Sequence, residues 1–121
     1  MRLPIRLPAA TMSLAPPFTA ETAHKKVKAA QNLWNTQLRK ELFAFSSNRI
    51  AVQFWYEYQD SHDNMKWKRC YGLEDWTYDD EDGGKMRKRQ MSGNDVEIAE
   101  GQRWFKEGVD VDSVEIGEEH W

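Results

Sequence analysis

Cysteine is nearly absent from this 121-residue sequence, in which Cys70 is the only one. A single thiol excludes an internal disulfide, and it excludes a metal site with two thiolate ligands from one chain. No apolar run approaches the length that spans a bilayer. The net charge of -3 also gives no general attraction to nucleic acid or to an anionic membrane. We therefore expect neither a membrane nor nucleic acid as a partner.

Aromatic side chains, in contrast, are abundant. Six tryptophans, four tyrosines and five phenylalanines supply a large apolar area for so short a chain. The length predicts one domain. We expect a disordered extension over residues 1–15, a folded domain over residues 16–108 and an acidic tail over residues 109–121.

The compartment is only weakly indicated. One cysteine fits a reducing compartment, so we expect a cytoplasmic protein. Residues 1–20 contain arginine and no acidic residue, as organelle-targeting segments do, which leaves such targeting open. Pro4 and Pro8 would, however, interrupt the amphipathic helix that a targeting segment needs. Met12 offers an alternative start.

An amphipathic helix is predicted to begin near Thr19. Thr19 can cap the helix, and Glu21 in the first turn suits the positive end of the helix dipole. Apolar residues then recur at spacings of three and four, namely Ala23, Val27, Ala30, Leu33 and Trp34. Polar residues occupy the other side, which indicates a helix with one buried face.

Residues 34–45 allow two interpretations. The helical spacing continues through Leu38, Leu42 and Phe45, so one helix could run from Thr19 to about Phe45. The sequence over residues 42–45, followed by a Ser-Ser-Asn turn, is equally typical of a strand that enters a tight turn. Both interpretations stay open from the sequence.

The rest of the chain predicts mainly strands. Residues 49–60 alternate, with Ile50, Val52, Phe54, Tyr56 and Tyr58 on one face. A second strand is expected over residues 66–78, an acidic hairpin loop over 79–84 and a returning strand over 85–94. Residues 97–106 are predicted to form a short closing helix, and residues 109–121 either dock or stay mobile. The fold class expected is α+β, with a curved antiparallel sheet of about four strands on an N-terminal helix.

Six segments, in this order, carry a family resemblance. They are residues 17–23 (PFTAETA), 41–45 (ELFAF), 48–52 (NRIAV), 69–72 (RCYG), 74–76 (EDW) and 94–100 (NDVEIAE). Together they resemble an uncharacterised branch of the nuclear-transport-factor-two-like superfamily, close to the SnoaL-like proteins. The resemblance implies a cone-shaped fold, in which a curved sheet wraps around helices and encloses a pocket. It also implies that a small molecule binds there and that dimers form through the sheet.

The sequence departs from that family at two places. In the family, the Trp-Asn helix end (here Trp34 and Asn35) is followed by a second helix, a short strand and a long third helix. Here residues 35–38 join the first helix directly to the next strand, so an internal helix-strand-helix segment is missing. Leu73 also stands where the family commonly has a polar residue. With so little helix left, part of the aromatic sheet should stay open to water, and we expect a monomer of marginal stability.

The candidate binding site lies on the second strand and its neighbour. It comprises a guanidinium, a phenol, two carboxylates and two indoles: Trp55, Glu57, Arg69, Tyr71, Glu74 and Trp76. These groups could orient a small polar ligand or tune a carboxylate as a general base. Alternation places Arg69 and Tyr71 on one face and Glu74 and Trp76 on the other. Ordinary cross-strand ion pairs and aromatic pairs are therefore the favoured interpretation.

Other groups of reactive side chains are better explained without a ligand. His62 with Asp60 and Asp63 could hold a metal, but a solvated turn is favoured, and we expect no metal and no cofactor. The basic run over residues 85–89 offsets neighbouring acids and protects a strand edge. A cation beside Cys70 could lower the pKa of the thiol, yet a packed thiol is the simpler assignment.

Two functions from different classes follow. The first is a small-molecule-binding domain of unknown activity, impaired by the internal deletion, for which enzymatic activity is neither predicted nor excluded. The second is a non-catalytic interaction protein that forms a homodimer through its sheet face.

Overall fold

One helix and four strands form the fold of the chain, which the computed structural model describes over residues 15–33, 37–80 and 83–121. Helix α2 (Ala20–Asn32) begins where the sequence predicts it. The Thr19 hydroxyl accepts a hydrogen bond from the backbone N–H of Thr22, and the Thr22 hydroxyl accepts one from the backbone N–H of Thr19. This reciprocal cap satisfies two N–H groups that would otherwise lack partners at the helix start.

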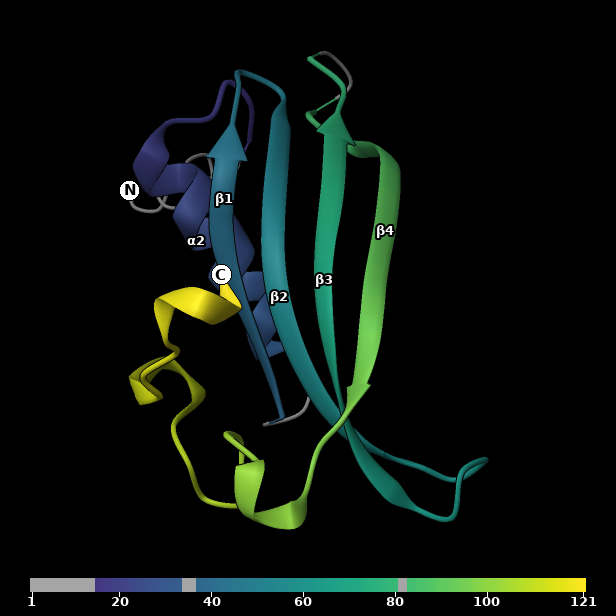
Figure 1. The fold of residues 1–121 in the computed structure, drawn as a ribbon. Helices are drawn as coiled ribbons and strands as arrows, with labels where there is room; N and C mark the ends of the chain where they lie inside the picture. Colours follow the sequence, from purple (N-terminus) through teal and green to yellow (C-terminus); the bar gives the residue numbers. More distant parts are fainter. Residues whose placement is uncertain (1–14, 34–36, 81–82) are drawn as a thin grey trace, which may run out of the picture.

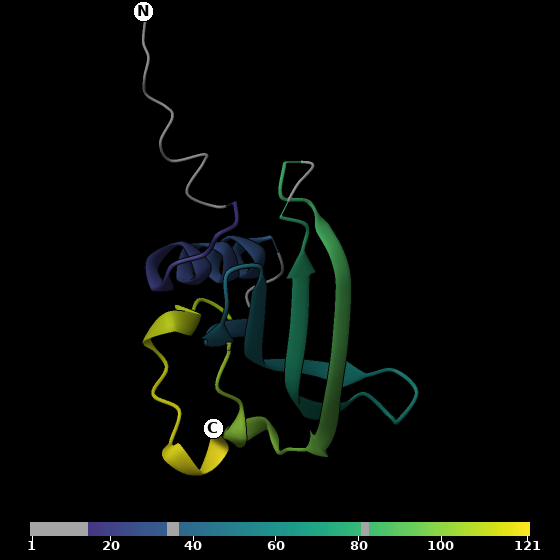
Figure 2. The same cartoon turned by 90° about the horizontal axis from the view of Figure 1, so that it is seen from above.

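The four strands form one antiparallel sheet in the order β1-β2-β3-β4 (Figure 1). They are β1 (Leu38–Phe45), β2 (Arg49–Asp60), β3 (Lys66–Tyr78) and β4 (Met86–Glu97). The predicted bounds of β2 and β3 are confirmed, and β4 extends three residues beyond its predicted end. The sheet is curved and does not close (Figure 2), so the α+β fold class is confirmed.

Strand β1 shows that residues 38–45, for which the sequence allowed either a helix or a strand, form a strand. Leu38 to Phe45 pairs with β2, from Leu38 opposite Tyr56 to Phe45 opposite Ile50. A helix continuing to Phe45 is therefore wrong. Residues 34–36, and residues 1–14 of the expected extension, lie outside the described residues.

The sheet has two differently covered faces. The face that α2 covers, here called the helix face, carries the β2 residues Ile50 and Val52, which pack against Ala23 and Val27 of the helix. The opposite face, here called the tail face, carries Trp55. Residues 98–121, the C-terminal segment, cover Trp55 with the buried side chains of Phe105 and Ile116. Helix α2 and the C-terminal segment lie on either side of β1 (Figure 2).

The closing helix predicted over residues 97–106 is wrong. The chain forms only a three-residue 3-10 turn, η2 (Glu100–Gln102), and Arg103 returns to an extended conformation. The reason is a long-range contact, because the Glu57 carboxylate accepts the backbone N–H groups of Trp104 and Phe105. Those N–H groups cannot then bond within a helix. The segment continues through η3 (Val111–Ser113) and η4 (Glu118–His120) and docks on the sheet.

Strand β4 has little cover. All twelve of its residues are exposed, in contrast to the largely buried β2 and β3. Within the residues described, no helix combines the length and the apolar character that crossing a bilayer requires.

Gly72 tests the packing of the helix face. The Phe54 ring lies directly over Gly72 on the neighbouring strand, so a Cβ at position 72 would overlap the ring. We expect Gly72→Ala to lower the free energy of unfolding by about 1–3 kcal/mol, because the ring must move off its rotamer. Urea unfolding followed by circular dichroism measures this loss.

Gly101→Ala is the matched control, since nothing lies within 4 Å of a Cβ at that position. The packing account is contradicted if Gly72→Ala is as stable as Gly101→Ala.

Candidate functional site

The six residues of the predicted site divide between the two faces of the sheet. On the tail face, Trp55 pairs with Tyr71 and Glu57 pairs with Arg69 across β2 and β3. Glu74 and Trp76 lie on the helix face, opposite Val52 and Ile50. This division follows the alternation expected from the sequence, so the six residues do not line one pocket.

The tail-face group fastens the C-terminal segment. The buried Glu57 carboxylate accepts hydrogen bonds from Arg69 Nε at 2.8 Å and from the backbone N–H groups of Trp104 and Phe105 at 3.0 and 2.9 Å. Arg69 Nη2 also donates to the Gln102 carbonyl at 2.6 Å. The guanidinium lies 3.4 Å from the centre of the Trp104 ring, a close cation–π contact.

His120 joins the same group from the end of the chain. Its Nδ1 lies 2.8 Å from the Tyr71 hydroxyl, and its carbonyl accepts a hydrogen bond from Trp55 Nε1 at 3.1 Å. No pattern around His120 in the acidic tail predicts this contact. All four predicted tail-face side chains are thus engaged with residues 98–121. They hold the segment in place, which accounts for these four side chains without a ligand.

The helix face carries a buried cluster of charges around Glu74. The Glu74 carboxylate pairs with Lys40, accepts a hydrogen bond from Trp76 Nε1 at 3.1 Å and accepts one from Arg89 Nε at 2.6 Å. Burial alone would raise the pKa of Glu74. The hydrogen bonds and positive charges of Lys40 and Arg89, with the Trp76 hydrogen bond, outweigh burial and hold the pKa below its usual range.

A cleft of about 330 Å³ opens beside this cluster, between α2 and strands β3 and β4. Its walls are mostly apolar and its inner end is charged. The lining residues are Lys26, Ala29, Ala30, Leu33, Lys40, Trp76, Tyr78, Met86 and Arg89. Trp76 is the only one of these that belongs to the predicted site. The strand interpretation of residues 42–45 would have found Lys40 only if it had been extended back to Leu38, because Lys40 then lies between Leu38 and Leu42 on a buried face.

Tyr78 lines the cleft and carries a hydroxyl that is itself buried and unsatisfied among the described residues. Its side chain is 2% exposed, and among the described residues its hydroxyl has no hydrogen-bond partner. Burial raises the pKa of this hydroxyl to about 12, so it stays protonated at neutral pH and can donate a hydrogen bond. A buried polar atom without a partner costs stability, so this hydroxyl is a weak point in the packing unless a further group binds it.

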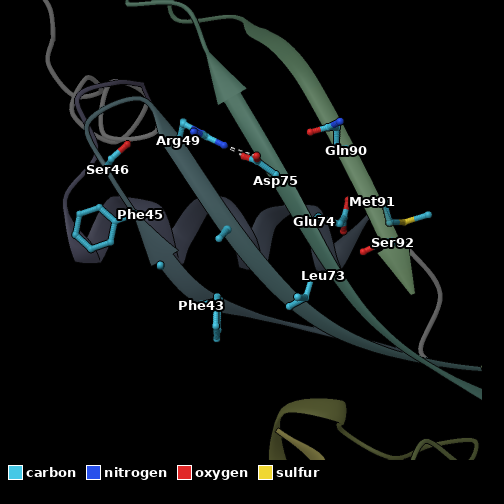
Figure 3. Close-up of a pocket in the computed structure, with 12 residues that line it drawn as sticks. Phe43, Phe45, Ser46, Arg49, Leu73, Glu74, Asp75, Gln90, Met91 and Ser92 are labelled. Atoms are coloured by element: carbon cyan, nitrogen blue, oxygen red, sulfur yellow. Dashed lines mark hydrogen bonds and ion pairs between the residues drawn. The ribbon is translucent and has the colours of Figure 1, made fainter. Parts of the chain in front are cut away.

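A second, shallower depression of about 660 Å³ lies on the tail face, beyond the C-terminal segment (Figure 3). Phe43, Phe45 and Leu73 line it and are exposed, with Phe43 63% exposed. An ion pair between Arg49 and Asp75 crosses it. Its apolar, open shape suits a protein surface better than a small molecule.

Reactive groups elsewhere are held in ordinary contacts. Burial, followed by the nearby Asp95 carboxylate, raises the pKa of the Cys70 thiol to about 11, so a thiolate activated by a cation is wrong. In the basic run, Arg87 pairs with Asp79 and Arg89 pairs with Glu74, as the sequence interpretation expects. Within the described ranges, no three His, Cys, Asp or Glu side chains are grouped as a metal site requires.

Comparison with known proteins gives one match. The model of a family described as a protein of unknown function (DUF1348) matches the chain over residues 16–38 and 36–106. No curated protein matches the chain.

The role of Glu57 can be tested by removing its charge. We expect Glu57→Gln to lower the free energy of unfolding by ~3–5 kcal/mol, because the buried Arg69 loses its counter-charge. Hydrogen exchange should rise at residues 103–121 and stay unchanged in α2. Glu107→Gln, an exposed carboxylate of the same segment, is the control. Equal hydrogen exchange at residues 103–121 in both variants would contradict the role of Glu57 in holding the C-terminal segment.

The role of Glu74 has a pH signature. Because the folded-state pKa is lowered, this carboxylate contributes stability above its unfolded pKa, and the contribution is lost as pH falls through the folded pKa. Glu74→Gln should therefore be less stable than wild type at pH 7, and the difference should shrink on acidification below the unfolded value of 4.5. Urea unfolding at several pH values measures this difference.

Asp75→Asn is the matched control for Glu74→Gln, because it breaks an ion pair with a largely exposed arginine and should cost less than ~1 kcal/mol. A stability difference between wild type and Glu74→Gln that does not change with pH contradicts the ion-pair account.

Proposed function

Since the chain belongs to this family of unknown function, DUF1348, its activity must be inferred from its own surface, and we propose that it is a small-molecule-binding domain. The binding site is the cleft between α2 and strands β3 and β4. The observation that carries the proposal is a mostly apolar cleft lined by the cationic side chains of Lys26, Lys40 and Arg89, next to a Tyr78 hydroxyl that is buried and has no hydrogen-bond partner among the described residues. A few convergent polar groups within apolar walls are the usual composition of a small-molecule site.

The polar groups define where such a molecule would be oriented. Tyr78 offers a donor to a molecule that displaces the atoms over its hydroxyl, and Lys40 and Arg89, which pair with Glu74, line the cleft with positive charge. The Lys26 ammonium lies 5.2 Å from the centre of the Tyr78 ring and adds a positive charge at the wall. Trp76 and Met86 supply apolar surface. A molecule with an apolar body and a hydrogen-bond acceptor fits these walls.

The same proposal includes an impaired site, of the SnoaL-like type, that has lost an internal helix-strand-helix segment. Two facts support this loss. The family match consists of two segments that meet at residues 36–38, next to the place where the resemblance implies the loss. The cleft is also open, because Leu33 at the end of α2 is 87% exposed and β4 has no cover. An open cleft buries less of its ligand, so we expect weak binding.

Tyr78→Phe tests the proposal most sharply. In the free protein it removes a hydroxyl that has no partner among the described residues, so the variant should be as stable as wild type or more stable. Thermal-shift screening with a library of small metabolites identifies molecules that stabilise wild type. Isothermal titration of those molecules should then show an affinity lower by about fivefold or more in Tyr78→Phe.

A pair of tryptophan substitutions on α2 provides the control. Ala29→Trp would fill the cleft and should abolish binding, whereas His24→Trp lies on an exposed part of α2 outside the lining and should not. If no library member binds, or if Ala29→Trp binds as well as wild type, the cleft is not the site.

A second candidate function is a non-catalytic interaction protein that dimerises through its sheet face. The exposed apolar depression around Phe43 and Leu73 favours it. A dimer that Leu73→Asp disrupts, together with no response to any metabolite, would support this function over the first.

A further inference from the structure

We propose that two copies of this chain pair antiparallel through the outer edges of their β4 strands, which joins two four-stranded sheets into one continuous sheet. This inference concerns the edge of the sheet. It does not depend on the small-molecule cleft, and it differs from dimerisation through the sheet face.

The two edges of the sheet are treated differently by the chain. At the β1 edge, the backbone N–H of Lys40 donates to Gln31 Oε1 at 2.7 Å, and the Lys40 carbonyl accepts from Lys28 Nζ at 2.8 Å. Arg39 also reaches across to the Val114 carbonyl at 2.6 Å. Side chains of α2 therefore satisfy the backbone N–H and carbonyl groups of Lys40 that another strand would otherwise bind, and the β1 edge is blocked at that residue.

The β4 edge lacks such protection. Among the described residues, no strand pairs with its outer side, and all of its residues are exposed. Just beyond β4, the Ile98 N–H donates to the Trp67 carbonyl at 3.0 Å, so Ile98 faces β3. Because backbone groups alternate in direction along an antiparallel strand, the odd-numbered residues point theirs outward. These are Arg89, Met91, Gly93, Asp95 and Glu97.

The charges of β4 favour a second copy as the partner, in addition to the pairs that Arg87 and Arg89 form within the chain with Asp79 and Glu74. Basic residues occupy one end, at residues 87–89, and acidic residues occupy the other, at Asp95 and Glu97. A two-fold antiparallel pairing brings the basic end of each strand against the acidic end of its partner. Opposite charges across neighbouring strands stabilise a pairing, and like charges destabilise it. In a parallel arrangement, the β4 strands of two copies would place like charges against each other. In the antiparallel arrangement, their charges are complementary.

One register satisfies both the backbone and the charges. When the two-fold axis passes through Ser92, outward-pointing residues face one another, with Arg89 opposite Asp95 of the second copy and Met91 opposite Gly93. Arg87 is the extra residue of a β-bulge, because Lys88 pairs with Thr77 and Met86 with Tyr78. It lies near Glu97 of the second copy. The bulge ends the regular strand. The two-fold pairing uses the β4 edges of both copies, and the β1 edges are blocked at Lys40, so pairing stops at a dimer.

Charge exchange between two variants tests this interface. Arg87→Glu and Glu97→Lys alter side chains that are 60% and 58% exposed, so both full-length variants should fold, which circular dichroism checks. Each variant homodimer places like charges opposite one another twice. In sedimentation velocity, wild type should dimerise with increasing concentration, and each variant should dimerise at least about tenfold more weakly.

An equimolar mixture of the two variants should recover the dimer, because every altered charge then faces its opposite, and native mass spectrometry should find the heterodimer. Leu73→Asp, on the tail face, should dimerise like wild type. The proposal is overturned if wild type stays monomeric, if it forms open-ended assemblies, or if the mixture gains nothing over the separate variants. It is also overturned if Leu73→Asp alone abolishes the dimer.

Discussion

Few elements pack against the faces of the sheet in this molecule. Where they pack determines which strands are buried and which are exposed. A sheet with many aromatic side chains must have its faces covered to be stable in water. Here a helix of 13 residues covers part of one face, and residues 98–121 cover part of the other. Both elements lie over β2 and its neighbours, so the fully buried side chains of Ile50, Val52 and Trp55 come from β2, while β4 is bare.

Buried ion pairs, in addition to apolar contacts, connect the sheet to the segments that pack against it. Glu57 and Glu74 are both buried, one on each face, and each accepts several hydrogen bonds from partners distant in the sequence. Such clusters contribute little net stability compared with well-packed apolar groups, but breaking one leaves an uncompensated charge. They therefore specify where the C-terminal segment and β1 lie rather than adding much stability. The chain leaves the helical conformation at residues 103–105 because the backbone N–H groups of Trp104 and Phe105 bond to Glu57 rather than within a helix.

Local patterns in the sequence predict those elements whose conformation is determined by interactions between residues close in sequence. The alternation over residues 49–60 and the cap at Thr19 each agree with the structure. The division of Arg69 and Tyr71 from Glu74 and Trp76 also follows from alternation alone. Long-range contacts could not be predicted. The closing helix was wrong because of Glu57, forty-seven residues away from Trp104, and Lys40 was missed because a helix through residue 45 would place it in solvent. Tyr78 was missed because its defining property, an unpartnered hydroxyl, exists only in the folded chain.

Membership in the DUF1348 family gives this arrangement a context without assigning an activity. The cleft beside α2 and the exposed β4 edge have the same cause, because helix α2 covers only part of the helix face. A longer or additional helix on that face would enclose the cleft and would restrict access to β4. The geometry thus points to the least protected part of the molecule as the place to test for function.

Native-state hydrogen exchange of single backbone amides, at a concentration low enough to keep the chain monomeric, tests this account of unequal cover most directly. Amides in the centres of β2 and β3 should exchange only through global unfolding, and those of β4 should exchange at least about a hundredfold faster through local opening. Uniform protection across all four strands would contradict it.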